Sequence, residues 1–471
     1  MVFSSAIFLF AFFPAVFVLY HIVPGLKAKN VILIFASLVF YSFGQPKYLI
    51  LLFVSVLINY AAGFVLCGEG SYRKAALAAA ILLNVALLSV FKYLDFAVEN
   101  INSVFGVSVA LPGIVLPIGI SFYTFQGMSY VIDVYRDHTI GTKNFGKLLL
   151  YISFFPQLIA GPIIKYHDIA EMIDSRKCSP VDTAEGLRRF IVGLSKKLLL
   201  ANTAGAVADQ VFALDTGSLD VRTAWLGAIC YTLQIYFDFS GYSYMAIGMG
   251  RIFGFRFLEN FNYPYVSTTI QEFWRRWHIS LSSWFRDYLY IPLGGSYCSR
   301  LRTDINKFIV FFTTGLWHGA NWTFVLWGLW HGLFSTLEDV GIIPRKKIEK
   351  RVIGHIYTML VVVLGFVLFR ADTLSQAGVM FSQMFTGFEF TPEKDLVLHN
   401  LLSHSNIAMI LLAVVLSVNW LPRIRSKMQK ISAKRRIFCE MIAYTAVFIL
   451  FIYDILNLSQ ATFNPFIYFQ F

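Results

Sequence analysis

Three histidines lie within a short stretch of the chain that is also rich in tryptophan. Residues 271–331 contain His278, His318 and His331, together with seven of the nine tryptophans. Histidine exchanges a proton most readily near neutral pH, since its unperturbed pKa is about 6.5. A histidine held in a polar pit could take the proton from a hydroxyl group as that hydroxyl attacks an acyl donor. His318 is the first candidate for such a general base.

The depth of His318 follows from the apolar run before it. Residues 308–317 make about 15 Å of helix at ~1.5 Å per residue, whereas a membrane crossing takes about 20 residues. If Lys307 lies near one membrane face, His318 lies roughly half-way across. Gly315 and Gly319 flank His318, so the helix is expected to bend or break there. Membrane proteins tolerate such breaks where the chain lines a cavity.

Other polar residues are candidates to support this histidine. We expect His278 to orient the substrate or His318, although a structural hydrogen bond would explain it equally well. On a helix His278 would share one face with Trp274 and Ser282. The residues that we consider as supporting walls of the cavity are Asn321, His331, Arg275, Arg276 and Asp238.

Asp238 lies inside an otherwise apolar run. Carboxylates at membrane depth are costly and are functional candidates by default. Two interpretations stay open: a wall of the cavity, or a hydrogen-bonded helix break next to Gly241.

The composition predicts an all-α polytopic membrane protein. Hydrophobic residues make up 57% and charged residues only 14% of the chain, against about 25% charged in soluble domains. The net charge of +12 is explained better by basic cytoplasmic loops than by nucleic-acid binding. We expect one membrane domain over residues 1–471, with a catalytic block at 271–331 and about eleven crossings plus re-entrant pieces.

The basic links set the expected orientation. Links 339–351 and 422–437 are rich in Lys and Arg and should be cytoplasmic. Link 370–405 and the tail 457–471 then fall on the outer side. Residues 185–200 alternate basic and apolar positions at helical spacing, which predicts an interfacial amphipathic helix.

Metal and nucleotide chemistry are disfavoured. The histidines do not form an i,i+4 pair or an HExxH motif, so a zinc site is not expected. The five cysteines form no zinc or redox spacing. No GxSxG elbow, phosphate loop or dinucleotide fingerprint occurs in a usable context.

Several motifs resemble the membrane-bound O-acyltransferase family, in its bacterial alginate O-acetylation branch. The strongest are WRRWHISLSSWFRDYLYIPLGGS and GLWHGANWTFVLWGLWHG in the histidine block. The likeness continues in LPIGISFYTFQGMSYVIDVYR (116–136), FFPQLIAGPI (154–163), the stretch 234–265 and the closing PFIYFQF. The resemblance implies a ring of about eleven transmembrane helices around a central funnel with re-entrant helices. It places the catalytic histidine on His318 and a second one on His278.

The resemblance also implies an activity. The protein would be a bacterial inner-membrane O-acetyltransferase that moves an acetyl group from a cytoplasmic donor, acetyl-CoA, to an exported polysaccharide. No bound cofactor is expected, and alginate is the first choice of polymer. An extracytoplasmic partner of the serine-hydrolase-like class would complete the transfer. D-alanyl transfer or peptidoglycan O-acylation by the same machinery is the alternative.

The C-terminal tail suggests an acyl relay. Related D-alanylation systems resemble a relay through a tyrosine near the C-terminus of a small partner, so Tyr468 is a candidate to present the acyl group to His318. An aromatic tail should not lie free in water, but simple packing on the helix ends explains that equally well. Two other classes stay open: a glycan or lipid transporter that uses the same polar pit, and a scaffold for a soluble acetyltransferase.

Overall fold

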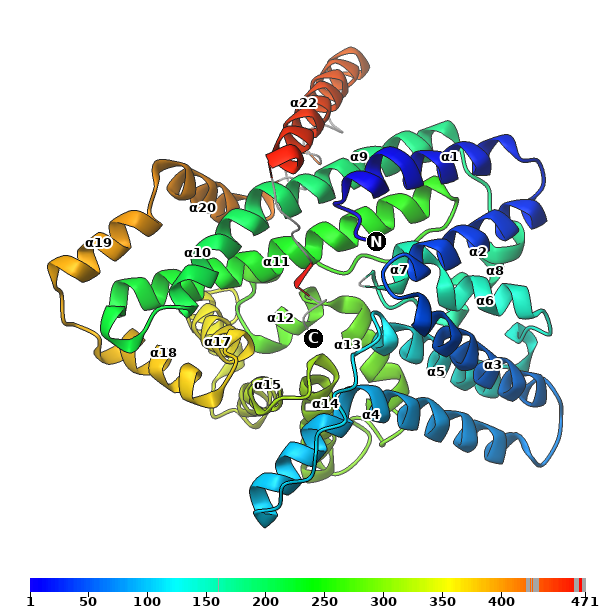
Figure 1. Cartoon of the computed structure of the whole chain (residues 1–471), viewed down its shortest axis with the longest axis horizontal. Coiled ribbons are helices and arrows are strands. Elements are labelled where there is room, and N and C mark those ends of the chain that lie inside the picture. The colour runs from blue at the N-terminus through cyan, green and yellow to red at the C-terminus, as the bar shows by residue number, and fades with distance from the viewer. Residues whose placement is uncertain (160, 421–423, 425, 427–431, 461–465, 468–471) are drawn as a thin grey trace. The chain divides into compact units, whose positions relative to one another are not determined.

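The structure is a computed structural model in which residues 1–159, 161–420, 424, 426, 432–460 and 466–467 are described. Every regular element in these residues is a helix, which confirms the all-α prediction (Figure 1). The chain divides into two compact units. The first unit comprises residues 1–190, 243–258 and 463–470, and the second comprises 191–242, 259–462 and 471.

Several helices are long and apolar enough to cross a membrane. Five qualify in the described residues, and the pair α19 (Pro392–Leu401) and α20 (His404–Leu416), bent by 65°, is a possible sixth. The five cover Pro46–Leu66, Arg73–Phe105, Pro180–Phe212, Val352–Arg370 and Ala433–Ser459. The chain is therefore a multi-pass membrane protein, while the ring of eleven helices stays a prediction.

The first unit begins with a series of helices whose core contains packed aromatic side chains. They are α1 (Phe13–Ile22), α2 (Leu26–Ser42), α3 (Leu49–Leu66), α4 (Arg73–Phe105), α5 (Ile120–Arg136), α6 (Phe145–Ser153), α7 (Phe155–Leu158) and α8 (Tyr166–Ser175). Phe8 contacts Phe40 and Phe155 in the core. Asn59 and Asn84 exchange two amide hydrogen bonds between α3 and α4, of 3.0 and 3.1 Å.

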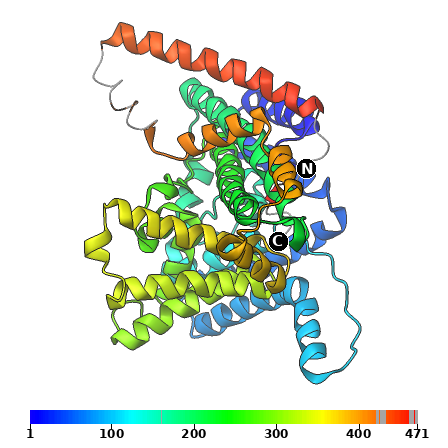
Figure 2. The ribbon, with the colours of Figure 1, turned by 90° about the vertical axis from the view of Figure 1, so that its left-hand side faces the viewer.

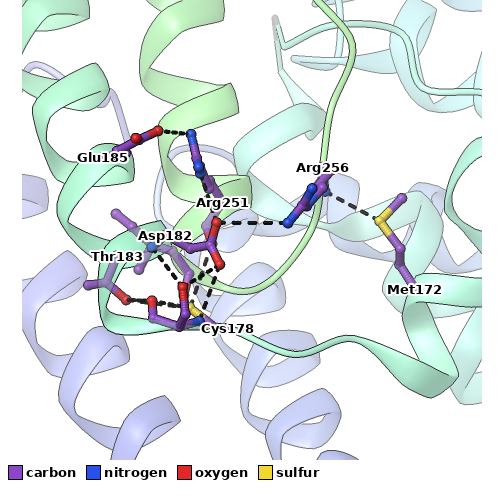
Figure 3. Close-up of polar contacts among 9 residues, drawn as sticks. Met172, Cys178, Asp182, Thr183, Glu185, Arg251 and Arg256 are labelled. Atoms are coloured by element: carbon purple, nitrogen blue, oxygen red, sulfur yellow. Dashed lines mark hydrogen bonds and ion pairs between the residues drawn. The ribbon is translucent and has the colours of Figure 1, made fainter.

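An ionic cluster joins two helices inside the first unit (Figure 3). Arg251, near the end of α11 (Val221–Ile252), pairs with Asp182 at 3.1 Å and with Glu185, both in α9 (Pro180–Ser195). The backbone N–H of Arg256 donates to the Met172 sulfur at 3.3 Å. The two ion pairs of Arg251 fix the start of α9 against the end of α11.

The second unit carries the histidine block. Its helices include α10 (Asn202–Phe212), α12 (Ile270–Arg276), α13 (Ile279–Phe285), α14 (Arg300–His318), α15 (Trp322–Val340), α17 (Val352–Arg370), α18 (Leu374–Thr386) and α22 (Ala433–Gln460). Helix α14 packs along α15, and α15 packs along α17 (Figures 1 and 2). A Cβ at Gly315 or Gly328 would collide with backbone oxygen of the facing helix. Glycine at these positions lets the two helices approach closely, as is common in membranes.

Two sequence expectations prove wrong here. Residues 185–200 do not form a separate surface helix, because they lie within a longer helical run, Pro180–Phe212, that is long and apolar enough to cross a membrane. The helix does not break beside Asp238 either, since α11 continues through Gly241. The physical reason is shared: Lys197, in the π-helical segment Lys196–Ala201, pairs with Asp238 at 2.5 Å, and both side chains are buried. Mutual neutralisation makes burial of the two charges tolerable.

Candidate functional site

His318 lies at the point where α14 stops. The helix ends at His318, and Gly319 follows with extended backbone. This confirms the break expected from the flanking glycines. The side chain of His318 is only 2% exposed. The imidazole is therefore held at a helix terminus inside the second unit.

His278 occupies a strained junction between two short helices. Helix α12 ends at Arg276 and α13 begins at Ile279, while His278 has a left-handed backbone with a φ of 42°. The helix face expected for Trp274, His278 and Ser282 is therefore wrong. Strain of this kind in a non-glycine residue is often found at functional sites.

Contacts with a distant segment explain the junction. The Ile279 N–H donates to the Asn260 carbonyl, and the Asn262 N–H donates to the Arg276 carbonyl, both at 2.9 Å. These bonds satisfy backbone groups that a continuous helix would have paired internally. Segment 260–262 thus turns the His278 side chain out of the helical path.

A hydrogen-bond network orients the His278 ring. The Asn260 Oδ1 accepts from the Ser280 N–H at 3.2 Å and from the Ser280 hydroxyl at 2.9 Å. Because this oxygen is an acceptor, the contact of 3.2 Å from His278 Nδ1 assigns the ring proton to Nδ1. In neutral His278 the lone pair then belongs to Nε2. Asn260 is a site residue that sequence reasoning missed, because nothing local signals a contact across 18 positions.

The two histidine rings lie next to each other, edge to face, within aromatic walls. Their centroids lie 6.4 Å apart at an interplanar angle of 62°. Trp317 contacts both rings, and Trp327 and Phe369 contact His318 at 5.0 and 5.2 Å. All these residues belong to the second unit. An apolar enclosure excludes water and strengthens electrostatic interactions with a reacting group.

His331 is separated from His318 by the indole ring of Trp327, which contacts both histidines. It is fully buried and contacts Trp327 at 5.3 Å, the same indole that touches His318. Its other neighbours are Phe273, stacked at 5.9 Å, and Trp274 at 5.3 Å. The Trp327 indole therefore contacts both His318 and His331, while His278 contacts His318 and Trp317.

Three of the four remaining candidates form bonds that hold helices, and Arg275 is exposed. Asn321 caps α15 and donates to the Asp372 carbonyl at 2.9 Å. Arg276 pairs with Glu272 at 2.9 Å, and Arg275 is exposed. Asp238 forms the ion pair with Lys197, and the next residue, Phe239, contacts the His278 ring at 4.5 Å.

Glu338 is a second residue that sequence reasoning missed. Its carboxylate, 3% exposed, accepts the N–H groups of Ile270 and Gln271 at 2.6 and 3.2 Å. A carboxylate is favourable at a helix N-terminus, where the backbone N–H groups lack partners. The Tyr357 hydroxyl donates to the same carboxylate at 3.2 Å. Glu338 therefore ties α12, which leads to His278, to α15 and α17.

Two further sequence predictions concern metals and the tail. In the described ranges, no group of three or more His, Cys, Asp or Glu side chains is arranged to hold a metal ion. Tyr468 lies outside the described residues. Phe466 and Ile467, just before it, are buried, and the relay through Tyr468 stays a prediction.

The apolar helices define a multi-pass membrane protein, and its second unit encloses three buried histidines. The chain belongs to the membrane-bound O-acyltransferase (MBOAT) family, whose model matches residues 136–375. It is an O-acyltransferase.

Relatives span the whole chain. The chain is similar to the "Probable alginate O-acetylase AlgI" of Azotobacter vinelandii, with 39% identity over 100% of both chains. The protein of the same name in Pseudomonas putida is 38% identical over 100% of both chains. The "Peptidoglycan O-acetyltransferase" of Helicobacter pylori is 35% identical over 80% of this chain and 78% of its own length.

Proposed function

We propose that the chain transfers acetyl groups from cytoplasmic acetyl-CoA across the bacterial inner membrane for O-acetylation of an exported polysaccharide, with an alginate-like polymer as the first choice. The observation that carries the proposal is the buried pair His318 and His278 in one aromatic enclosure. The names of the relatives support acetyl transfer to a polymer.

In the proposed reaction His318 acts as the general base. It takes the proton from an acceptor hydroxyl while the hydroxyl oxygen forms a bond to the acetyl carbonyl carbon. The carbon–sulfur bond of the thioester then breaks, and the proton passes to the departing thiolate, so that His318 returns to its neutral form. His278, whose ring is oriented by Asn260, lies beside His318 and lines the pocket that receives the reactants. The aromatic walls keep water from hydrolysing the acetyl donor.

Two further parts of the proposal lie outside the buried site. The tail 457–471 faces the outer side, where a serine-hydrolase-like partner passes the acetyl group to the polymer. Tyr468 serves as the acyl relay on the way. Tyr468→Phe removes only a hydroxyl group and should abolish polymer acetylation. Full acetylation by this variant would exclude the relay and favour simple packing of the tail.

The direct test of the reaction is His318→Ala in a host that makes an acetylated polymer. Polymer acetylation should fall by about 10²-fold or more, the scale of a lost general base, while the protein still accumulates in the membrane. His404→Ala, which changes an exposed histidine at the start of α20, is the matched control and should acetylate normally. Loss of polymer export rather than of acetylation would indicate a transporter. Normal acetylation by His318→Ala would indicate a scaffold.

Peptidoglycan is the second candidate acceptor. It is favoured by the likeness to the Helicobacter pylori protein. Chemical analysis of the ester-linked acetyl groups on isolated peptidoglycan and on secreted polymer, with and without His318→Ala, decides between the two acceptors.

A further inference from the structure

An apolar cavity lies in the second unit, separate from the residues that enclose the two histidines. Its volume is about 720 Å³ and it is lined by side chains of α11, α17 and the end of α20. Ligand sites in proteins commonly have volumes of about 300–1,000 Å³. None of the lining residues contacts His318 or His278 in the ring contacts described above.

The walls of this cavity are mostly hydrocarbon, although Ser417, Asn419 and His355 are among the lining residues. Thr232 Oγ1 donates to the Ala228 carbonyl at 2.8 Å. The Tyr265 hydroxyl donates to the Thr232 carbonyl at 2.5 Å. The Trp225 indole N–H donates to the Met384 carbonyl at 2.9 Å. Because these polar groups bond to the protein itself, the cavity suits an aliphatic chain better than a sugar or a nucleotide.

The cavity is open to the surroundings along a helix that qualifies as a membrane span. On α17 it extends from His355 to Val363, which is about 12 Å of helix at ~1.5 Å per residue. Ile356 and Leu360, between these two residues, are 60% and 41% exposed. A lipid acyl chain in the membrane can therefore reach the cavity from the side.

One end of the cavity adjoins a basic segment, residues 345–351. His355 lies one turn after Arg351, which is the N-cap residue of α17. Among the described residues, no ion pair involves Lys346, Lys347, Lys350 or Arg351. The His355 Nδ1 lies 3.3 Å from the Ser267 carbonyl. Cationic side chains at a membrane surface attract anionic headgroups.

We propose that this cavity binds one acyl chain of an anionic phospholipid from the surrounding membrane, with the lipid phosphate against His355 and the basic segment 345–351. The apolar walls favour a hydrocarbon chain, and the cationic side chains of segment 345–351 favour an anionic headgroup over a neutral one. This lipid site is separate from the acyl-transfer site and does not depend on the polymer that is acetylated.

The test is native mass spectrometry of the full-length protein titrated with phosphatidylglycerol or with phosphatidylcholine of the same acyl chains. Val414→Trp fills the cavity from α20, and Val415→Trp places the same bulk on the neighbouring residue, which does not line it. The two valines are 45% and 54% exposed, so they form a matched pair. Val414→Trp should bind phosphatidylglycerol about tenfold more weakly, and Val415→Trp should bind it as the unaltered protein does.

The headgroup is tested separately. Arg351→Gln should weaken phosphatidylglycerol binding about fivefold and leave phosphatidylcholine binding unchanged. If Val414→Trp does not yield a monodisperse protein, Leu360→Trp fills the cavity from α17 instead. The proposal is overturned if both valine variants bind phosphatidylglycerol equally, if phosphatidylcholine binds as tightly, or if the lipid lost on filling the cavity is a polyprenyl phosphate.

Discussion

At the scale of single residues, the local backbone at His318 could be predicted from the sequence, whereas the backbone at His278 could not. The break at His318 was predictable, because Gly315 and Gly319 flank it. The conformation of His278 was not, because its left-handed backbone depends on hydrogen bonds with segment 260–262, which lies far away in the sequence. Local propensity would have continued the helix, and tertiary contacts overrode it.

The strain at His278 leads to a test that separates its backbone from its imidazole. Glycine adopts positive φ at no steric cost, whereas alanine does not. His278→Gly should therefore be more stable than His278→Ala, by about 1 kcal/mol. Both variants should lose acyl transfer to the same extent, because both lack the imidazole.

Thermal unfolding in detergent and acetyl transfer in membranes measure the two properties. Greater stability of the alanine variant would show that the left-handed backbone is not retained. Substantial activity in the glycine variant would remove His278 from the reaction.

At the scale of helices, the site depends on how α12 is held. The carboxylate of Glu338 binds the free N–H groups at the start of α12, and its own helix, α15, also carries Trp327 and His331. The sequence marks Glu338 only as a charged residue near the end of an apolar run. That position does not reveal which helix N-terminus it meets.

Glu338→Gln should loosen α12. The amide has one acceptor oxygen in place of two, so one buried N–H group loses its partner at a cost of about 1–3 kcal/mol. We expect a lower unfolding temperature and reduced acetyl transfer, measured on the same preparation. Glu349→Gln, at an exposed glutamate, is the control and should change neither property. Equal stability of the two variants would show that the Glu338 contacts do not hold α12.

The helical run Pro180–Phe212 shows why the periodicity of the sequence did not predict how this segment packs. Alternating basic and apolar residues predicted a helix on the membrane surface, yet Lys197 is buried against Asp238. In the sequence, Lys197 and Asp238 are two separate charged residues in apolar segments. Their pairing depends on the packing of two helices, which periodicity does not encode.

At the scale of the whole molecule, composition was sufficient to predict the class of protein. Membrane insertion and the all-α fold follow from the apolar runs and the shortage of charge. The sequence did not reveal that all the residues of the histidine enclosure belong to one of two compact units. The second unit therefore holds both histidines of the proposed acyl-transfer step and the aromatic side chains around them.

The most direct test of the account is the sidedness of acetyl transfer in proteoliposomes. Vesicles with the protein in one orientation would receive radiolabelled acetyl-CoA either outside or inside, with a soluble polysaccharide acceptor and the exported partner on the opposite side. We predict labelled polymer only when acetyl-CoA meets the face that carries the link 339–351, and none with His318→Ala. Transfer from either face, or unchanged transfer by His318→Ala, would contradict the account.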